Sequence, residues 1–175
     1  MEYIDIVDEN GNKTGEIRSR VDVHKYGLLF QAVHLWVVNS KSEILLQKRS
    51  DNLRNFPGKW DISAGGALVQ GEELIDAVKK ESFEEIGLSV DESKLKFIGT
   101  ISEQVVYNDY IDNGICSIYI THSDLPIDDF TKKQNEVQDL KWFPLMAFKK
   151  MVAEQNPELV PHWQEYELLI KELEK

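Results

Sequence analysis

The sequence predicts an α/β fold in which helices cover both faces of a mixed sheet. Apolar, β-rich segments occur before, between and after segments of helical character, without the regular strand–helix alternation of a wholly parallel sheet. A chain of 175 residues can bury one good core with an appended helix, whereas two domains would each be small. We therefore expect a single domain over residues 1–175.

A β hairpin is expected at the amino end. Residues 3–7 alternate apolar and polar side chains, residues 8–12 supply the turn sequence Asp-Glu-Asn-Gly-Asn, and residues 13–20 form a polar run. Residues 1–27 are interpreted as an amino-terminal hairpin extension, and the core is expected over residues 28–145.

Two central antiparallel strands are expected next. The segment 30–38 is apolar and rich in β-forming residues, and after the polar residues 39–42 the apolar character resumes over 44–49. Residues 51–59 are polar and contain Pro-Gly, which indicates a loop, and residues 60–64 offer a short strand.

The best helix in the chain is predicted over residues 72–86. It ends at Gly87, because glycine readily adopts the left-handed conformation that closes a helix. The remaining elements are strands over residues 95–101, 114–121 and 140–143 and helices over residues 145–154 and 162–174. Residues 146–175 are therefore interpreted as carboxyl-terminal helices.

Charge and composition limit the classes of function. A formal net charge of -11 and a pI near 4.8 argue against binding to nucleic acid polymers or anionic membranes, which need cationic surfaces. Cys116 is the only cysteine, and no apolar run approaches the roughly 20 residues of a membrane span. We expect a cytoplasmic protein with a small-molecule partner, and the hairpin and the last helix as candidate contacts of a homodimer.

An acidic face is the most informative feature of the predicted helix. At about 100° per residue, Glu81, Glu84 and Glu85 share one face, and Glu81 and Glu85 align with the apolar Leu74 and Val78. Clustered carboxylates near a helix carboxyl end repel one another and the helix dipole. A hard cation such as Mg²⁺ or Mn²⁺ would compensate, whereas the simplest alternative is a solvated acidic face.

The segment from Gly66 to Leu88 resembles the box of the Nudix hydrolase superfamily. The positions in register are Gly66, Glu72, Glu81, Glu84, Glu85, Gly87 and Leu88. Lys80 stands where the box has Arg, which keeps the charge but loses the planar fork. Ser82 stands where the box has an aliphatic residue. The resemblance implies a Nudix-type α/β/α sandwich with a mixed sheet, an amino-terminal hairpin extension and a carboxyl-terminal helix.

The resemblance also implies a reaction and a metal cofactor. We expect a metal-dependent hydrolase that cleaves the diphosphate bond of a nucleoside diphosphate, or of one linked to another moiety. The cofactor would be Mg²⁺ or Mn²⁺, held by Glu81, Glu84, Glu85 and the backbone of Gly66.

Other roles in and around the box follow from the same resemblance. Glu72 would be structural and paired with Lys80, and Gly87 would end the helix. The candidate catalytic carboxylates are Glu84, Glu85, Glu103 and Glu136.

Basic and aromatic residues outside the box have less specific assignments. Lys48, Arg49 and Arg54 lie in or just before the loop that precedes the box and are candidate phosphate ligands, with exposed surface charge as the alternative. His24 and His34 are interpreted as packed or hydrogen-bonded core groups. The tryptophans are assigned to core packing, and Cys116 to buried filler.

Residues outside the box resemble one branch of the superfamily, related to type I isopentenyl diphosphate isomerase. This resemblance covers roughly residues 1–145 and includes the segments 24–34, 44–50 and 56–61. That isomerase has a catalytic Cys shortly after the Trp, but Trp60 is followed by Asp-Ile-Ser-Ala-Gly-Gly. Isomerase chemistry would lack its thiol. A prenyl diphosphate isomerase and a catalytically inactive nucleotide-binding module remain as alternatives.

Overall fold

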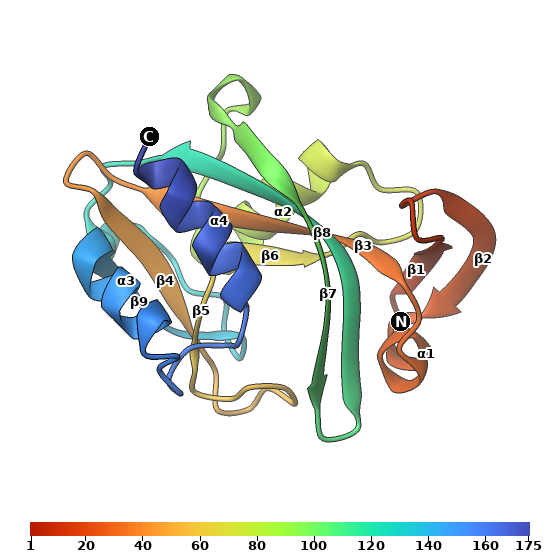
Figure 1. The fold of residues 1–175 in the computed structure, drawn as a ribbon. Coiled ribbons are helices and arrows are strands. Elements are labelled where there is room, and N and C mark those ends of the chain that lie inside the picture. Colours follow the sequence, from red (N-terminus) through yellow and green to blue (C-terminus); the bar gives the residue numbers. More distant parts are fainter.

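The computed structural model describes every residue from Met1 to Lys175 and contains a nine-stranded mixed sheet (Figure 1). The strands are β1 (Tyr3–Val7), β2 (Lys13–Ser19), β3 (Phe30–Val38), β4 (Glu43–Arg49), β5 (Trp60–Asp61), β6 (Ala64–Ala67), β7 (Lys96–Tyr107), β8 (Tyr110–His122) and β9 (Val137–Pro144). The helices are α1 (Arg20–Tyr26), α2 (Leu74–Ile86), α3 (Leu145–Ala153) and α4 (Trp163–Leu173), with short 3₁₀ helices at Glu92–Lys94 and Ile127–Asp129. The expected α/β class is confirmed.

Strand β3 organises the sheet. It pairs in parallel with β8 along its whole length and antiparallel with β6. The expected antiparallel pairing with β4 is limited to Val37 opposite Leu45 and Val38 opposite Ile44, beside the connecting turn. Beyond the turn the buried Ser63 hydroxyl bridges the two strands. It donates to the Leu45 carbonyl at 2.5 Å and accepts from the Val37 amide at 2.8 Å. The two strands therefore diverge, and β4 continues with β5 and β9.

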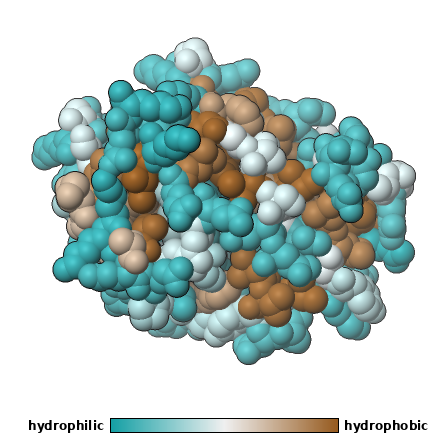
Figure 2. Space-filling model, in the orientation of Figure 1, coloured by the Kyte–Doolittle hydropathy of each residue, from teal (hydrophilic) through white to brown (hydrophobic).

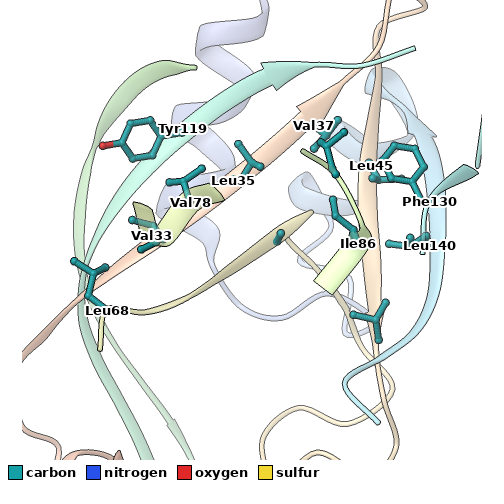
Figure 3. Close-up of a cluster of buried hydrophobic side chains, with 14 residues drawn as sticks. Val33, Leu35, Val37, Leu45, Leu68, Val78, Ile86, Tyr119, Phe130 and Leu140 are labelled. Atoms are coloured by element: carbon teal, nitrogen blue, oxygen red, sulfur yellow. The ribbon is translucent and has the colours of Figure 1, made fainter. Parts of the chain in front are cut away.

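One face of the sheet packs against α2. Val33, Leu35 and Val37 project from alternate positions of β3 into a hydrophobic cluster that includes Val78 and Ile86 of the helix (Figure 3). These side chains are almost fully buried. This packing fixes the rotation of α2 about its axis, and with it the direction of the helix's glutamates.

The opposite face packs against α3 and α4, which lie in front of the sheet in Figure 1. Trp36 of β3, Phe148 of α3, and Tyr166 and Leu169 of α4 are fully buried in a second cluster. By the same alternation, His34 lies on this face. The last helix is therefore part of the core and reaches the residues that neighbour Trp36.

The amino-terminal segment forms the expected hairpin, and β1 joins the sheet where Ile6 lies opposite Phe30. The short helix α1 was not expected, since only its first residue, Arg20, belongs to the polar run 13–20 and the rest of the helix had been assigned to no element. It begins because the Ser19 hydroxyl accepts a hydrogen bond from the Asp22 amide, and it ends at Gly27, which is left-handed.

The strands after α2 are longer than the sequence indicated. β7 and β8 pair antiparallel from Lys96 opposite Ile120 to Tyr107 opposite Tyr110. The expected strands covered only the part over the core, because the outer part mixes polar and apolar residues, and the two strands are held together there by their mutual pairing.

Hydrophilic side chains cover much of the outer edge of the face drawn in Figure 2, and hydrophobic side chains are visible between them. None of the helices has the length and apolar character needed to cross a membrane. The helices are amphipathic and use their apolar sides against the sheet.

Candidate active site

A cavity of about 300 Å³ is lined by residues of α1, β3, β4, β6, α2 and β8 and by the segment just before α4. It includes Glu85, Gly65 and Gly66 from the glutamate-rich segment, together with His34 and His162. A volume of this size is at the small end for ligand sites, and the polar groups that converge on it make it the candidate active site.

Glu85 is the buried acid of the cavity and is 8% exposed. Its Oε2 accepts hydrogen bonds from Gln47 Nε2 at 2.9 Å and from the Gly65 amide at 3.1 Å. Burial, with the nearby Glu81 carboxylate as a second cause, raises the pKa of Glu85 to about 8. The two donors hold the carboxylate in one orientation.

Glu81 lies one helical turn before Glu85 and packs directly against Gly66. A Cβ atom at Gly66 would lie 2.9 Å from the Glu81 carboxyl carbon, closer than real contacts allow. Lys80 Nζ is 3.2 Å from Glu81 Oε1. Burial raises the pKa of Glu81, and Lys80 opposes this shift. A larger residue at position 66 would therefore displace this carboxylate from its observed place.

Glu84 lies on the solvent side of the acidic face and does not line the cavity. Lys133 Nζ is 3.6 Å from Glu84 and 2.9 Å from Glu136, which does line the cavity. Glu103, the remaining candidate carboxylate, contacts His162 Nδ1 at 3.3 Å. The four candidates thus occupy different environments.

The chemistry of these donors fits a hard divalent cation. Glu81 and Glu85 supply carboxylate oxygens on one side of a helix, and the Glu81 carboxylate lies directly against the Gly66 backbone. No three acidic, histidine or cysteine side chains are already gathered as a complete metal site. Lys80 and Lys133 approach Glu81 and Glu84, so cation binding would exchange these ammonium contacts for metal–oxygen contacts.

Other polar residues of the segment from Gly66 to Leu88 contact one another or the backbone of the segment. Lys80 Nζ is 2.8 Å from Glu72 Oε1, and Glu72 Oε2 accepts from the Val69 amide at 3.0 Å. The fully buried Ser82 hydroxyl donates to the Lys79 carbonyl at 3.1 Å, which satisfies the hydroxyl at this normally aliphatic position.

Two of the expected phosphate ligands are engaged by protein groups. Arg49 lines the cavity, but it donates to Asp61 at 3.0 Å and to the backbone and side-chain oxygens of Asn55 at 3.1 and 2.8 Å. Lys48 does not line the cavity, and its Nζ lies 5.9 Å from the centre of the Trp60 ring. Arg49 therefore holds the loop after β4 in place.

Arg54, an expected phosphate ligand, lies outside the cavity, whereas Arg20, which was not predicted, lines it. Arg54 is exposed, bonds Asp109 at 2.5 Å and is absent from the cavity lining. Arg20, at the start of α1, does line the cavity and bonds Glu2 at 2.6 Å. The sequence offered no signal for Arg20, because it lies in an ordinary polar run.

A buried ion pair joins β3 to α4. His34 Nδ1 donates to Glu165 Oε2 at 2.7 Å, and Trp36 Nε1 donates to Glu165 Oε1 at 2.8 Å. Burial alone would lower the pKa of His34, but Glu165 outweighs it and holds this pKa well above its usual value. The pKa of Glu165 is lowered, since the His34 charge outweighs the effect of burial.

Cys116 is half-buried and lines the cavity, 3.9 Å from His34 Nε2, so it is not the buried packing residue that was expected.

A second charged cluster surrounds His162. Its Nε2 lies 3.4 Å from Asp61 and its Nδ1 lies 3.3 Å from Glu103. Burial opposes protonation, but the hydrogen bonds to Asp61 and Glu103 outweigh it and raise the pKa of His162 to about 10. Burial would raise the pKa of Asp61, but His162 and Arg49 lower it.

His24 is buried as expected, yet it also lines the cavity. Its ring stacks on Tyr110 with 4.2 Å between centroids, and Nδ1 donates to the Ile111 carbonyl at 3.2 Å. Nε2 is buried without a hydrogen-bond partner, and burial lowers the pKa of the ring.

His162, Glu165 and Asp61 were not among the site residues predicted from the sequence. His162 and Glu165 have the i, i+3 spacing that puts both side chains on one face at the start of a helix, and this was the available signal. It could not identify their partners, because His34 lies 131 residues before Glu165.

Comparison with known proteins gives a consistent family. The family model described as "NUDIX domain" matches residues 28–163. Nudix hydrolase 3 of Arabidopsis thaliana is 31% identical over 167 residues, which are 92% of this chain and 22% of that protein, so the chain spans about a fifth of this relative's length. Isopentenyl-diphosphate Delta-isomerase 1 of Photorhabdus laumondii is 30% identical over 128 residues, or 72% of each chain.

Solved structures show the same fold. A crystal structure of a Deinococcus radiodurans protein superposes with a TM-score of 0.77 over 95% of this chain and 98% of the other, at 18% identity. The likeness at this identity concerns the architecture, which agrees with the family match.

Proposed function

Because the chain belongs to the Nudix family, we propose that it is a metal-dependent hydrolase that cleaves the diphosphate bond of a nucleoside diphosphate, or of a nucleoside diphosphate linked to another moiety. The observation on which the proposal rests is that Glu85 and Gly66 line the cavity and that Glu81 packs against Gly66 beside it. A buried, doubly hydrogen-bonded carboxylate beside a second carboxylate and a glycine is suited to cation-assisted phosphate chemistry.

Residues of one helix would hold the cation. Glu81 and Glu85 are the principal proposed ligands, with Glu84 from the same helix face and the backbone of Gly66. When bound, Mg²⁺ or Mn²⁺ would neutralise the diphosphate and increase the acidity of a coordinated water.

The chain must also accept a proton from the attacking water. The water oxygen would form a bond to phosphorus, the bridging P–O bond would break, and the water proton would pass to a carboxylate. Glu85 is the proposed acceptor because it is fixed in the cavity. Glu136 also lines the cavity and is the second candidate, whereas the contact of Glu103 with His162 favours a structural role.

The remaining expectations agree with a small-molecule enzyme. A cavity of about 300 Å³ accommodates part of a nucleotide but no polymer. We keep a cytoplasmic location and a homodimer formed through the hairpin or α4 as proposals. The single cysteine is consistent with a reducing compartment.

The isomerase relative supports a second candidate, an enzyme acting on a prenyl diphosphate. Cys116 lies at the cavity 3.9 Å from His34, so a thiol is present although none follows Trp60. Its position on β8 differs from the one expected for the isomerase thiol, and this disfavours the isomerase relative to the hydrolase.

The decisive experiment is phosphate or nucleotide release from a panel of nucleoside diphosphates and their sugar and dinucleotide conjugates, with Mg²⁺ or Mn²⁺. Glu85→Gln should lower kcat by about 10²–10⁴-fold, the usual contribution of a positioned base. Glu92→Gln, an exposed acid paired with Lys79, is the matched control. Turnover that persists in chelator would overturn the metal dependence, rearranged isopentenyl diphosphate would indicate the isomerase, and nucleotide binding without any product would indicate the inactive module.

A further inference from the structure

The ion pair between His34 and Glu165 lies on the cavity wall and is not explained by folding alone. The side chain of Glu165 is 1% exposed and that of His34 is 13% exposed. Burying two charges carries a desolvation penalty that apolar residues of similar size avoid, so such pairs are often neutral or unfavourable for stability. Most other side chains packed on this face of β3 are apolar. A charged pair here is therefore a candidate functional feature.

The hydrogen bonds of the pair fix the direction of the imidazole. Glu165 uses one oxygen for Trp36 and the other for His34 Nδ1. The opposite nitrogen, Nε2, has only the Cys116 sulfur nearby, at 3.9 Å, which is long for a hydrogen bond. One N–H donor of His34 is thus left available to a ligand in the cavity.

The other basic groups of the cavity are already engaged. Arg49 is held by Asp61 and Asn55, and both ring nitrogens of His162 face carboxylates. Arg20 is half-exposed and bonds Glu2 through Nη1. His24 offers an acceptor at Nε2, since its proton is directed to a carbonyl. Among the largely buried cations of the cavity, His34 has a nitrogen that no protein oxygen occupies.

His34 also lies next to Gly65, the residue whose amide donates to the proposed base Glu85. It is opposite Gly65 in the β3–β6 pairing, and the Gly65 amide donates to Glu85. A Cβ atom on Gly65 would lie 2.5 Å from the Val33 carbonyl oxygen and 3.0 Å from His34 Cδ2. Because Gly65 has no side chain, the His34 imidazole can lie directly beside it, next to the amide that donates to Glu85.

We propose that His34 donates a hydrogen bond from Nε2 to a phosphate oxygen of the bound diphosphate, and that Glu165 of α4 is the positioning residue that orients it. The inference rests on the proposed function and adds to it a substrate contact made by a residue outside the glutamate-rich segment. The ligand class is a diphosphate, because a cationic N–H donor complements its oxygen atoms. The carboxyl-terminal helix thereby becomes part of the substrate site.

The test measures binding without turnover. The probe is α,β-methylene-ADP with Mg²⁺, titrated calorimetrically into the full chain. The double variant His34→Leu/Glu165→Gln removes the donor without leaving a buried charge, and the amide oxygen of Gln can still accept from Trp36. Its affinity should fall about tenfold or more, the effect of losing one charge-assisted hydrogen bond. Phe148→Leu, in the core beside Trp36 and remote from the cavity lining, is the control for destabilisation and should retain affinity.

A measurement on the wild type covers the case in which the double variant does not fold. In nitrogen-15 NMR spectra, the Nε2 resonance of His34 should shift when α,β-methylene-ADP binds, while Nδ1 keeps its bond to Glu165. A purely structural ion pair predicts no shift at Nε2, and unchanged affinity in the folded variant would likewise overturn the proposal. Absence of metal-dependent hydrolysis would contradict the proposed function alone, because the binding and NMR measurements do not depend on turnover.

Discussion

Gln47 donates a hydrogen bond of 2.9 Å from its side-chain nitrogen to the carboxylate of Glu85, joining β4 to α2 at the cavity. Both side chains are buried. The bond links β4, the strand that diverges from β3, to α2, the helix that carries Glu81, Glu84 and Glu85. The orientation of the proposed base is therefore set by residues from two elements that are 38 positions apart.

Gln47→Leu should lower metal-dependent kcat by about tenfold or more, because a charge-assisted hydrogen bond of about 1.5–3 kcal/mol that orients Glu85 is lost. Steady-state kinetics would measure the change. Gln31→Leu removes a similar amide bond, to the Gly11 carbonyl, and should leave kcat unaltered. Equal kcat in wild type and Gln47→Leu would show that Glu85 does not need this donor.

Gly66→Ala should abolish most of the activity and weaken Mg²⁺ binding while the chain stays folded. The added methyl would lie 2.9 Å from the Glu81 carboxyl carbon and must displace that side chain. Metal titration by calorimetry together with the phosphate-release assay would measure both effects. Gly15→Ala, with no atom within 4 Å of the added methyl, is the control and should remain active. Normal metal affinity in Gly66→Ala would exclude the proposed cradle.

Gly87→Ala should destabilise the fold more than Gly71→Ala. Both glycines are left-handed, at φ 69 and φ 76, so each substitution loses about 1 kcal/mol of backbone preference. At Gly87 the methyl would also lie 2.3 Å from Thr131 Oγ1, whereas at Gly71 nothing lies within 4 Å. Urea unfolding would compare the two variants, and equal losses would mean that the Thr131 contact relaxes freely.

The free energy of unfolding should fall as pH rises from about 6.5 to 10. The pKa of His162 is raised to about 10 in the folded protein, so its stabilising charge is fully present below the ordinary histidine value of about 6.5 and is lost as pH rises through the folded value. The carboxylates that face it are Asp61, Glu103 and Glu165, and the lowered pKa values of Asp61 and Glu165 keep these two ionised over this window.

Urea unfolding at several pH values would measure this dependence, with an expected loss of about 2–4 kcal/mol at the alkaline end. His162→Gln should make the profile less steep and leave the part that comes from His34, whose pKa is also raised, and the exposed His122→Gln should preserve the profile. A wild-type profile that is level above pH 7 would contradict the buried, protonated state of His162.

Local periodicity allowed part of the candidate site to be predicted from the sequence. The spacing of Glu81, Glu84 and Glu85 fixes their shared face once α2 forms, because the turn of a helix is constant. The left-handed end at Gly87 and the charge complementarity of Glu72 and Lys80 are local in the same sense. The α/β class also followed from local patterns of apolar residues.

Tertiary packing decided which of these residues face the cavity and which residues join them. The burial of Glu85 and the exposure of Glu84 depend on how α2 docks on β3, and Arg49 became structural because Asp61 and Asn55 surround it. The pairing of His34 with Glu165 required α4 to pack across the sheet. Such contacts arise from long-range pairing and the exclusion of water, and no residue spacing along the chain specifies them.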